Sequence, residues 1–216
     1  MLDSLVNEAS IIAIKDNKEE INITHIDKAY LKILAGDEKK DKSFLNSKDK
    51  KIIAVHEAGH AIVTKVLNVA TISKISIIPT IKGAGGFCVN IFEDNLFKSK
   101  KELENQIISL YGGRCAEEII FGNDNVTTGA YNDIEKATNI IIDYISKYGM
   151  DNNILNYKML NEDKNIIEQY KNLSNILYEK CKNILLNNIN NLKILSNELL
   201  EKEVLNEKEI YSILKD

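Results

Sequence analysis

The stretch His56-Glu57-Ala58-Gly59-His60 is the most informative part of this chain. Residues at positions i and i+4 of a helix lie one turn apart on the same face, so both imidazoles can reach one metal ion. Glu57 is rotated about a quarter turn away, which is too far for a third ligand. Its carboxylate can instead accept a proton from a metal-bound water. The stretch therefore predicts a metal-binding helix that also carries a general base.

The residues around this motif indicate a helix that is buried on most of its surface. The flanking apolar residues occur nearly all round it: Ile52, Ile53, Val55, Ile62, Val63, Val66 and Leu67. We expect the helix to run from about Ser47 to Leu67. Glycine in a helix interior costs about 1 kcal/mol relative to alanine, so Gly59 predicts close approach of another element or of a substrate backbone. Buried histidines need partners, and a metal ion supplies one.

Composition limits the class of protein. The 216 residues suit one or two compact domains, and the hydrophobic fraction of 44% is enough for a core. A net charge of −4 and a pI of about 5.6 argue against a nucleic-acid partner. The chain contains no run of 18 apolar residues and no signal peptide. We therefore expect a soluble polypeptide without membrane contacts of its own.

The cysteines and the glycine-rich turn exclude two kinds of site. Cys88, Cys115 and Cys181 are scattered and form no CxxC pair, so they predict neither a disulfide framework nor a thiolate zinc site. We interpret them as core thiols in a reducing compartment. The turn at 83–86 is not followed by Lys-Ser/Thr, so it is not a phosphate loop, and no nucleotide site is predicted in this chain.

The periodicity of apolar residues predicts a mainly helical chain with a small β-sheet, an α+β fold. The first expected helix covers residues 3–15. A capping box of Thr24 and Asp27 is expected to begin the second helix, which runs through Leu34 and is stopped by Gly36. His25 lies in the first turn of this helix, and we interpret it as a surface residue. Residues 37–46 are rich in lysine and aspartate and predict a linker between domains. The expected later elements are strands at 74–79 and 87–92 and helices at about 98–120, 130–148, 162–190, 190–202 and 206–214.

A catalytic zinc needs three protein ligands, and the chain offers two candidates for the third. Glu117 shares a helix face with Leu110, Gly113 and Ile120, so we expect it to point inward, while Glu118 is expected to pair with Arg114 one turn away. Asp133 falls in the first turn of the next helix, where a carboxylate is favoured by the helix dipole with or without a metal. Spacing alone does not choose between Glu117 and Asp133.

Five segments together resemble one known family. They are HEAGH (56–60), SIIP (76–79), GGRCAEEIIFG (112–122), VTTGAYNDIEKAT (126–138) and LLEKEVLNEKEI (199–210). Their combination resembles the peptidase domain of the FtsH family, which are membrane-anchored, ATP-dependent zinc proteases. The resemblance implies a zinc peptidase domain over 47–216, with a zincin-like metal-binding helix. Residues 1–36 are similar to the last helices of the lid subdomain of an AAA ATPase, whose core, with its ATP and magnesium, is absent from this chain.

The resemblance also implies roles for individual residues. The aspartate that serves as third ligand in the family falls on Asp133, so one zinc per chain would be held by His56, His60 and Asp133, with Glu57 as the catalytic base. Glu117 would then orient a ligand histidine. The family binds substrate as an added strand along a sheet edge, and the matching residues here are Phe87, Cys88, Val89, Asn90 and Ile91.

The implied function is hydrolysis of peptide bonds in unfolded or membrane proteins. The full-length protein would form a homo-hexamer anchored in a bacterial, mitochondrial or plastid membrane. The alternative is a non-catalytic oligomerisation module braced by zinc, but such a site would not need Glu57 and usually closes with a fourth protein ligand. A small-molecule metallohydrolase is disfavoured because an edge strand suits an extended polypeptide. One departure from the family is the stretch 150–171, which lacks the usual glycine- and proline-containing loop.

Overall fold

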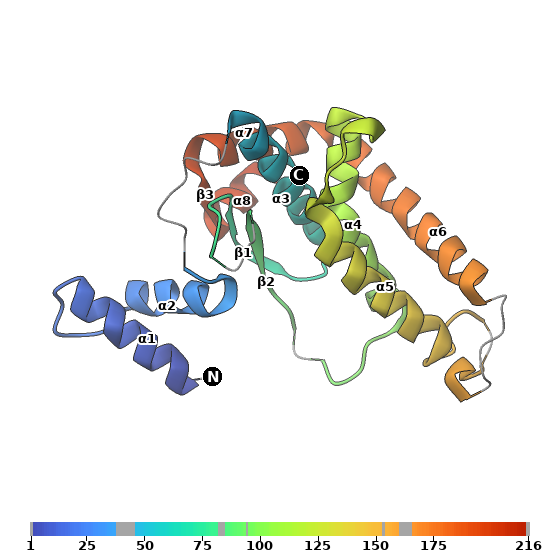
Figure 1. Cartoon of the computed structure of the whole chain (residues 1–216), viewed down its shortest axis with the longest axis horizontal. Coiled ribbons are helices and arrows are strands. Elements are labelled where there is room, and N and C mark those ends of the chain that lie inside the picture. Colours follow the sequence, from blue (N-terminus) through green and yellow to red (C-terminus); the bar gives the residue numbers. More distant parts are fainter. Residues whose placement is uncertain are drawn as a thin grey trace.

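The protein is described here from a computed structural model, which covers residues 2–37, 46–81, 85–93, 95–152, 154–159 and 166–214. Most of these residues are helical, and three short strands form one antiparallel sheet near the middle of the molecule (Figure 1). The α+β class that the sequence predicts is confirmed.

The described elements follow the chain in an order close to the predicted one. They are α1 (Leu2–Lys15), α2 (Ile23–Ala35), α3 (Ser47–Val66), β1 (Thr71–Ser76), β2 (Phe87–Ile91), α4 (Lys100–Phe121), α5 (Tyr131–Ser146), α6 (Ile166–Asn187), α7 (Ile189–Lys202), β3 (Val204–Asn206) and α8 (Glu207–Ile213). Every described α-helix was predicted with both ends within four residues of these bounds. The hydrophobic periodicity therefore fixed the helices well.

Local capping sets the ends of α3 and α4. The side chain of Asn46 accepts a hydrogen bond of 2.8 Å from the Asp49 N–H and so begins α3. Ser99 and Glu102 form a reciprocal capping box at the start of α4. Gly122 ends α4 with a φ of 85°, which a residue with a side chain rarely adopts.

Helix α3 is the centre of the fold and crosses α4 at van der Waals distance. A Cβ atom placed on Gly59 would lie 2.4 Å from the carbonyl oxygen of Gly112 and 2.5 Å from the Cβ of Ala116. A Cβ on Gly112 would in turn lie 2.8 Å from the Gly59 oxygen. The close approach predicted at Gly59 is confirmed: the neighbour is α4, and the two glycines allow the backbones to touch.

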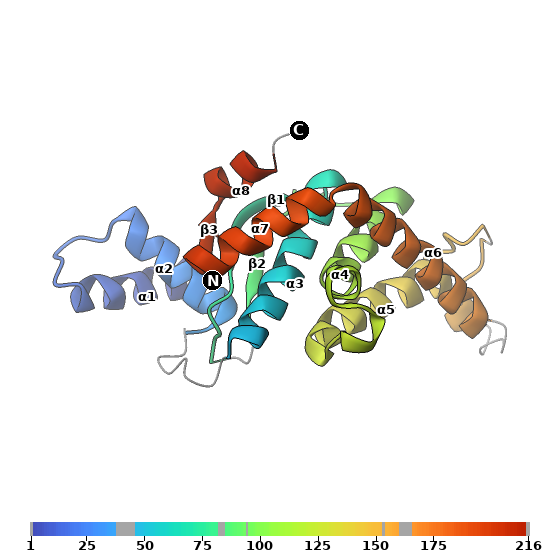
Figure 2. The ribbon, with the colours of Figure 1, turned by 90° about the horizontal axis from the view of Figure 1, so that it is seen from above.

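Other helices enclose this pair. In Figure 2, α7 passes across α3, and α6 lies beside α4. Fully buried leucines of these two helices complete the core around α3 and α4: Leu177, Leu185, Leu192, Leu195 and Leu199. The interior is therefore a helical core with the sheet on one side of it.

The sheet has the order β2-β1-β3, so β1 is central and β2 is an edge strand whose hydrogen-bonding neighbour among the described residues is β1. The predicted bounds of the first strand, 74–79, are wrong, because β1 ends at Ser76. The N–H of Ile78 donates to the Ser76 hydroxyl at 3.2 Å, and Pro79 has no N–H to continue the ladder. Strand β3 was not predicted; it exists because Leu205 pairs with Ile75 and is fully buried.

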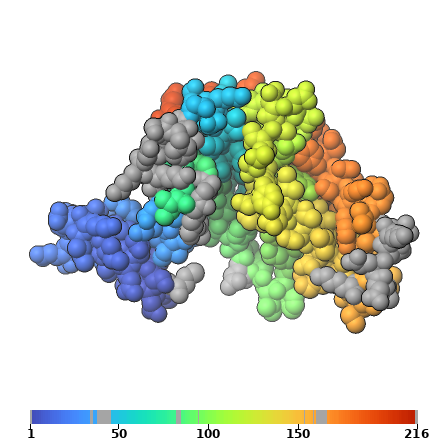
Figure 3. Space-filling view, in the orientation of Figure 1, coloured from blue at the N-terminus to red at the C-terminus, as the bar shows by residue number. Residues whose placement is uncertain are grey.

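Helices α1 and α2 pack against each other and form a lobe at one side of the molecule, drawn in blue in Figure 3. The predicted Thr24–Asp27 capping box is wrong: Asn22 caps α2, and the third position of the box is His25. The surface placement of His25 is also wrong, since it is 2% exposed and its Nδ1 accepts a hydrogen bond from the Asn22 N–H. Most of the predicted linker, 38–45, lies outside the described residues.

Candidate metal centre

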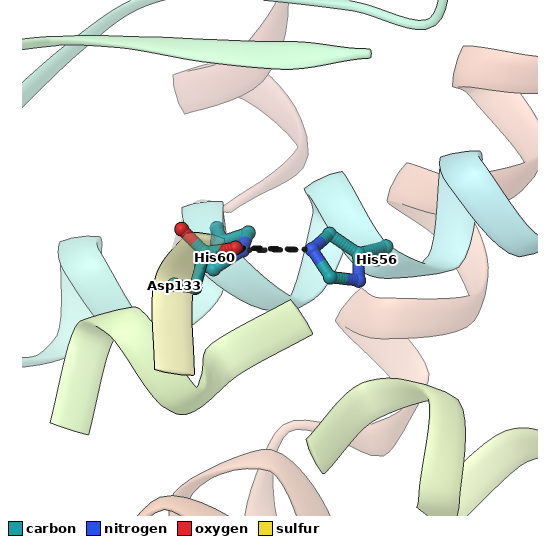
Figure 4. Close-up of side chains that lie close together, drawn as sticks. All are labelled: His56, His60 and Asp133. Atoms are coloured by element: carbon teal, nitrogen blue, oxygen red, sulfur yellow. Dashed lines mark hydrogen bonds and ion pairs between the residues drawn. The ribbon is translucent and has the colours of Figure 1, made fainter. Parts of the chain in front are cut away.

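Three side chains from two helices converge on one point (Figure 4). Helix α3 supplies His56 and His60, whose Nε2 atoms are 3.1 Å apart. The first turn of α5 supplies Asp133, whose Oδ2 lies 3.4 Å from the Nε2 of His56 and 3.2 Å from that of His60. Among the described residues, these three form the one group of histidine, cysteine and acidic side chains close enough together to hold a metal ion.

The separations between these atoms fit tetrahedral zinc. Zinc–nitrogen and zinc–oxygen bonds of about 2.0–2.1 Å at tetrahedral angles place neighbouring ligand atoms about 3.3–3.4 Å apart. The three separations observed, 3.1–3.4 Å, are close to that value. The three side chains remain 11%, 12% and 20% exposed, so a fourth position at the cluster is accessible to water.

The hydrogen bonds on the far side of each imidazole determine which nitrogen carries a proton. The Nδ1 of His56 lies 2.7 Å from Glu117 Oε1, and the Nδ1 of His60 lies 2.9 Å from the carbonyl oxygen of Ser109. A carboxylate and a carbonyl only accept hydrogen bonds, so each Nδ1 must donate. In the neutral imidazoles both Nε2 atoms then present lone pairs toward each other and toward the Asp133 oxygen. Three acceptors in contact require a cation between them.

Without that cation a proton can take its place, and the pKa values show this. Burial lowers the pKa of His56, but hydrogen bonds with Asp133 and Glu117 outweigh burial and raise the pKa to about 10. Burial would raise the pKa of Asp133, but its hydrogen bonds with both histidines hold the pKa well below the usual range. The site therefore attracts positive charge, either a proton on His56 or a metal ion.

Glu117 is buried between two elements of the site. It is 0% exposed; its Oε1 contacts His56, and its Oε2 accepts a hydrogen bond of 2.7 Å from the Thr127 N–H. Burial raises the pKa of Glu117, but these hydrogen bonds outweigh burial and lower the pKa. The ionised carboxylate thus links α3 to the loop that leads into α5 and Asp133. It reaches the outer nitrogen of His56 and lies outside the group of three converging atoms.

Glu57 lies beside the cluster without joining it. It is 7% exposed, and burial raises the pKa of its carboxyl, although the two histidines oppose this shift. A Cβ atom on Gly86, immediately before β2, would lie 3.1 Å from the Glu57 Cγ. The predicted substrate strand Phe87–Ile91 is β2, so it begins next to this carboxyl group.

Two residues that the sequence did not single out for this site also shape it. A Cβ on Gly113 would lie 2.3 Å from the His56 Nε2, so the missing side chain leaves room for the imidazole. A glycine within a helix is a usable signal, as at Gly59. Ser109 contacts His60 through its backbone carbonyl, and its hydroxyl contacts Thr64 Oγ1 at 2.6 Å. A backbone contact leaves no signal in the sequence.

The expected pairing of Glu118 with Arg114 is corrected by the structure. The two carboxylate oxygens of Glu118 accept hydrogen bonds from Lys182 Nζ at 2.7 Å and from the Tyr178 hydroxyl at 2.6 Å. Both partners belong to α6, which lies alongside this part of α4. The i, i+4 spacing predicted a local partner, but packing of a distant helix supplied two better ones.

The cysteines are free thiols, and Cys115 and Cys181 are buried. In the part of the chain that the structure describes, no helix has both the length and the apolar character needed to span a bilayer.

Comparison with known families agrees with this geometry. The model of peptidase family M41 matches residues 43–175. This chain belongs to peptidase family M41. The match covers α3, the sheet strands β1 and β2, α4 and α5, and so includes all the converging side chains.

Curated relatives extend the similarity over nearly the whole chain. The chain is 43% identical over 215 residues to the ATP-dependent zinc metalloprotease FtsH of Lachnoclostridium phytofermentans, covering 97% of this chain and 37% of that protein. It is 42% identical over 220 residues to FtsH 1 of Alkaliphilus metalliredigens, covering 98% and 37%, respectively. With the FtsH of Bacillus subtilis the identity is 42% over 151 residues, covering 69% and 23%. This M41 chain thus spans little more than a third of the length of the first two relatives.

Proposed function

We propose that this chain is the zinc-dependent endopeptidase part of an ATP-dependent, membrane-anchored protease that hydrolyses peptide bonds of unfolded or membrane proteins. The observation that carries the proposal is the convergence of three acceptor atoms, two of them on imidazoles whose other nitrogen must donate. Such a group fits zinc, and its exposure to water suits a catalytic site better than a closed structural one.

In this proposal His56, His60 and Asp133 hold one zinc ion per chain. When bound, zinc polarises the scissile carbonyl and lowers the pKa of a water molecule towards about 7. Glu117 holds His56 in the tautomer that can act as a ligand, and the Ser109 carbonyl does the same for His60. These contacts orient both rings before any ion arrives.

Glu57 is the general base. Its carboxylate accepts the proton of the attacking water and later delivers it to the nitrogen of the leaving amine. The raised pKa caused by burial supports this role, because a carboxylate with a higher pKa is a stronger base. Its place one residue after His56 keeps it beside the metal ligands without competing as one.

The substrate would bind as an extended strand along the free edge of β2, at Phe87, Cys88, Val89, Asn90 and Ile91. The edge position of β2 supports this proposal, since its outer N–H and C=O groups can pair with a peptide backbone. Backbone pairing also suits unfolded polypeptides of varied sequence.

The remaining features of the whole protein are proposals by the same route. Residues 1–36 would belong to the lid subdomain of an AAA ATPase, 37–46 to a linker and 47–216 to the peptidase domain. The ATPase module would bind ATP and magnesium, the assembly would be a homo-hexamer, and its anchor would lie in a bacterial membrane or in that of a mitochondrion or plastid. The names of the relatives, ATP-dependent zinc metalloproteases, support the ATPase module.

The test compares Glu57→Gln with the parent chain and with Glu201→Gln, a matched change of an exposed residue on α7. Zinc content is measured by atomic absorption, and cleavage with a quenched peptide. We expect Glu57→Gln to keep one zinc and to lose about 10²–10⁴-fold in turnover, while Glu201→Gln behaves like the parent. Undiminished cleavage by Glu57→Gln would refute the role of Glu57. Unfolding on chelation, without cleavage at any stage, would favour a zinc-braced assembly module instead.

A further inference from the structure

A hollow of about 170 Å³ lies at the far end of β2. Its walls come from three places: the turn between α3 and β1, the end of β2 with the residues after it, and the first turns of α4. It is distinct from the converging histidines, and of its lining residues only Ile91 belongs to the strand proposed above to bind substrate. A volume of this size holds several water molecules or one long side chain.

The edge strand leads from the metal centre to this hollow. Gly86 is next to Glu57, and from there β2 runs to Ile91, which lines the hollow. Helices α3 and α4 mark the same direction: His60 contacts Ser109 near the metal centre, and farther along Leu67 accepts a hydrogen bond from Asn105, another lining residue. At about 3.3 Å per residue, a peptide paired with β2 would span the distance from Gly86, beside Glu57, to Ile91 with about five residues, or about 17 Å.

The lining combines apolar surface with carboxylates. Ile91 and Phe92 are each 54% exposed, which leaves large apolar side chains at the mouth. Glu102 is held in place by hydrogen bonds from the N–H and hydroxyl of Ser99, which lower the pKa of its carboxyl and keep it ionised. Glu93 lines the same hollow, and none of the ion pairs found among the described residues involves it.

The one lysine in the lining is already engaged. The Nζ of Lys98 donates a hydrogen bond of 3.0 Å to the side-chain oxygen of Gln106. The described lining therefore presents two carboxylates and one ammonium group, whose charge contributes to lowering the pKa of the Glu102 carboxyl. Basic side chains suit such a place, because their aliphatic stems pack on apolar surface while the charged end stays at the acidic groups.

We propose that this hollow is a substrate subsite that takes a lysine or arginine side chain about five residues from the scissile bond. The stem would lie on Ile91 and Phe92, and the charged end would meet Glu93 and Glu102. The inference rests on the proposed peptidase function. Backbone pairing with β2 does not distinguish between side chains, and the subsite would add a preference for a basic residue at one position of the substrate.

Peptide binding is measured separately from cleavage, so that the subsite and the peptidase function can be refuted independently. The probes are labelled peptides identical except for Lys, Leu or Glu at the positions about four to six residues on either side of the cleavage site. Fluorescence anisotropy with the zinc-loaded Glu57→Gln chain gives their affinities without hydrolysis. We expect the lysine peptide to bind about threefold more tightly than the leucine peptide, as an exposed ion pair allows, and the glutamate peptide to bind most weakly.

The charge variants assign the preference to the hollow. In the Glu57→Gln background, Glu93→Gln should bring the lysine-to-leucine ratio close to one, and Glu93→Lys should favour the glutamate peptide. Glu201→Gln removes the same charge far along the chain and should leave the ratio at about three. Equal affinities for the three peptides, or a ratio that Glu93→Gln leaves unchanged, would overturn the subsite. Absence of zinc-dependent cleavage by the parent chain would overturn the peptidase function instead.

Discussion

Replacing Glu117 with glutamine tests the hydrogen-bond argument at the metal centre. The wild-type carboxylate accepts two hydrogen bonds, from His56 Nδ1 and from the Thr127 N–H, both at 2.7 Å. Glutamine has one accepting oxygen and one donating NH₂ group. The backbone N–H of Thr127 can only donate, so the amide oxygen must face it, and the NH₂ group must face His56.

That orientation forces a conflict in the histidine. To accept from the NH₂ group, Nδ1 of His56 must lose its proton, and the neutral ring then carries the proton on Nε2, the atom that would bind zinc in the proposed site. Keeping the binding tautomer instead leaves two donors facing each other in a fully buried place. Loss of such an orienting partner costs about 10–100-fold in metal affinity, which corresponds to about 1.4–2.7 kcal/mol.

The measurement is a competition titration of zinc against a chromophoric chelator. Glu118→Gln is the matched control, since the neighbouring carboxylate contacts Tyr178 and Lys182 and none of the ligands. We expect a weaker zinc affinity for Glu117→Gln and the parental affinity for Glu118→Gln, with both chains folded by circular dichroism. If Glu117→Gln binds zinc as tightly as the parent, Glu117 does not set the tautomer of His56, and the reasoning is refuted.

Three further predictions concern the crossing of α3 and α4, the position of the His56 ring and the pH dependence of zinc affinity. Gly59→Ala should destabilise the chain by about 1–3 kcal/mol, because its Cβ would collide with Gly112 and Ala116. This loss should appear although alanine has the better helix propensity. A thermal unfolding midpoint equal to or above that of the parent would contradict the close crossing. Gly113→Ala should displace the His56 ring and lower zinc stoichiometry, measured by atomic absorption, and full zinc occupancy would count against that contact. Because the pKa of His56 is raised to about 10 without metal, zinc must displace a proton below that pH. Apparent zinc affinity should therefore rise about tenfold per pH unit from 7 to 9; a flat profile in calorimetry would show that His56 is already neutral.

Much of the fold and part of the site could be predicted from local sequence. The i, i+4 spacing of His56 and His60 places both rings on one face of a helix, whatever the rest of the chain does. Apolar periodicity gave the helices, and Gly59 indicated a close neighbour before its identity as α4 was known. These predictions are correct because the geometry of a helix repeats every few residues and can therefore be predicted from short sequence spacings.

Contacts between distant segments could not be predicted from sequence spacing. Spacing left Glu117 and Asp133 as equal candidates, and the structure brings Asp133, 77 residues after His56, to 3.4 Å from its Nε2 while Glu117 takes the opposite nitrogen. The resemblance to a family had pointed to Asp133, but the reasoning from residues alone had not.

Glu118 pairs with α6 rather than with Arg114, and β3 forms because Leu205 meets Ile75 across a long stretch of chain. His25 differs, because its contact with the capping residue Asn22 spans only three residues. The sequence by itself determined the helices, the paired imidazoles and the carboxylate beside them, because hydrogen bonding and periodicity within a helix are local. Only the tertiary structure decided which acid completes the group and which carbonyl orients His60, because those choices depend on how the helices pack.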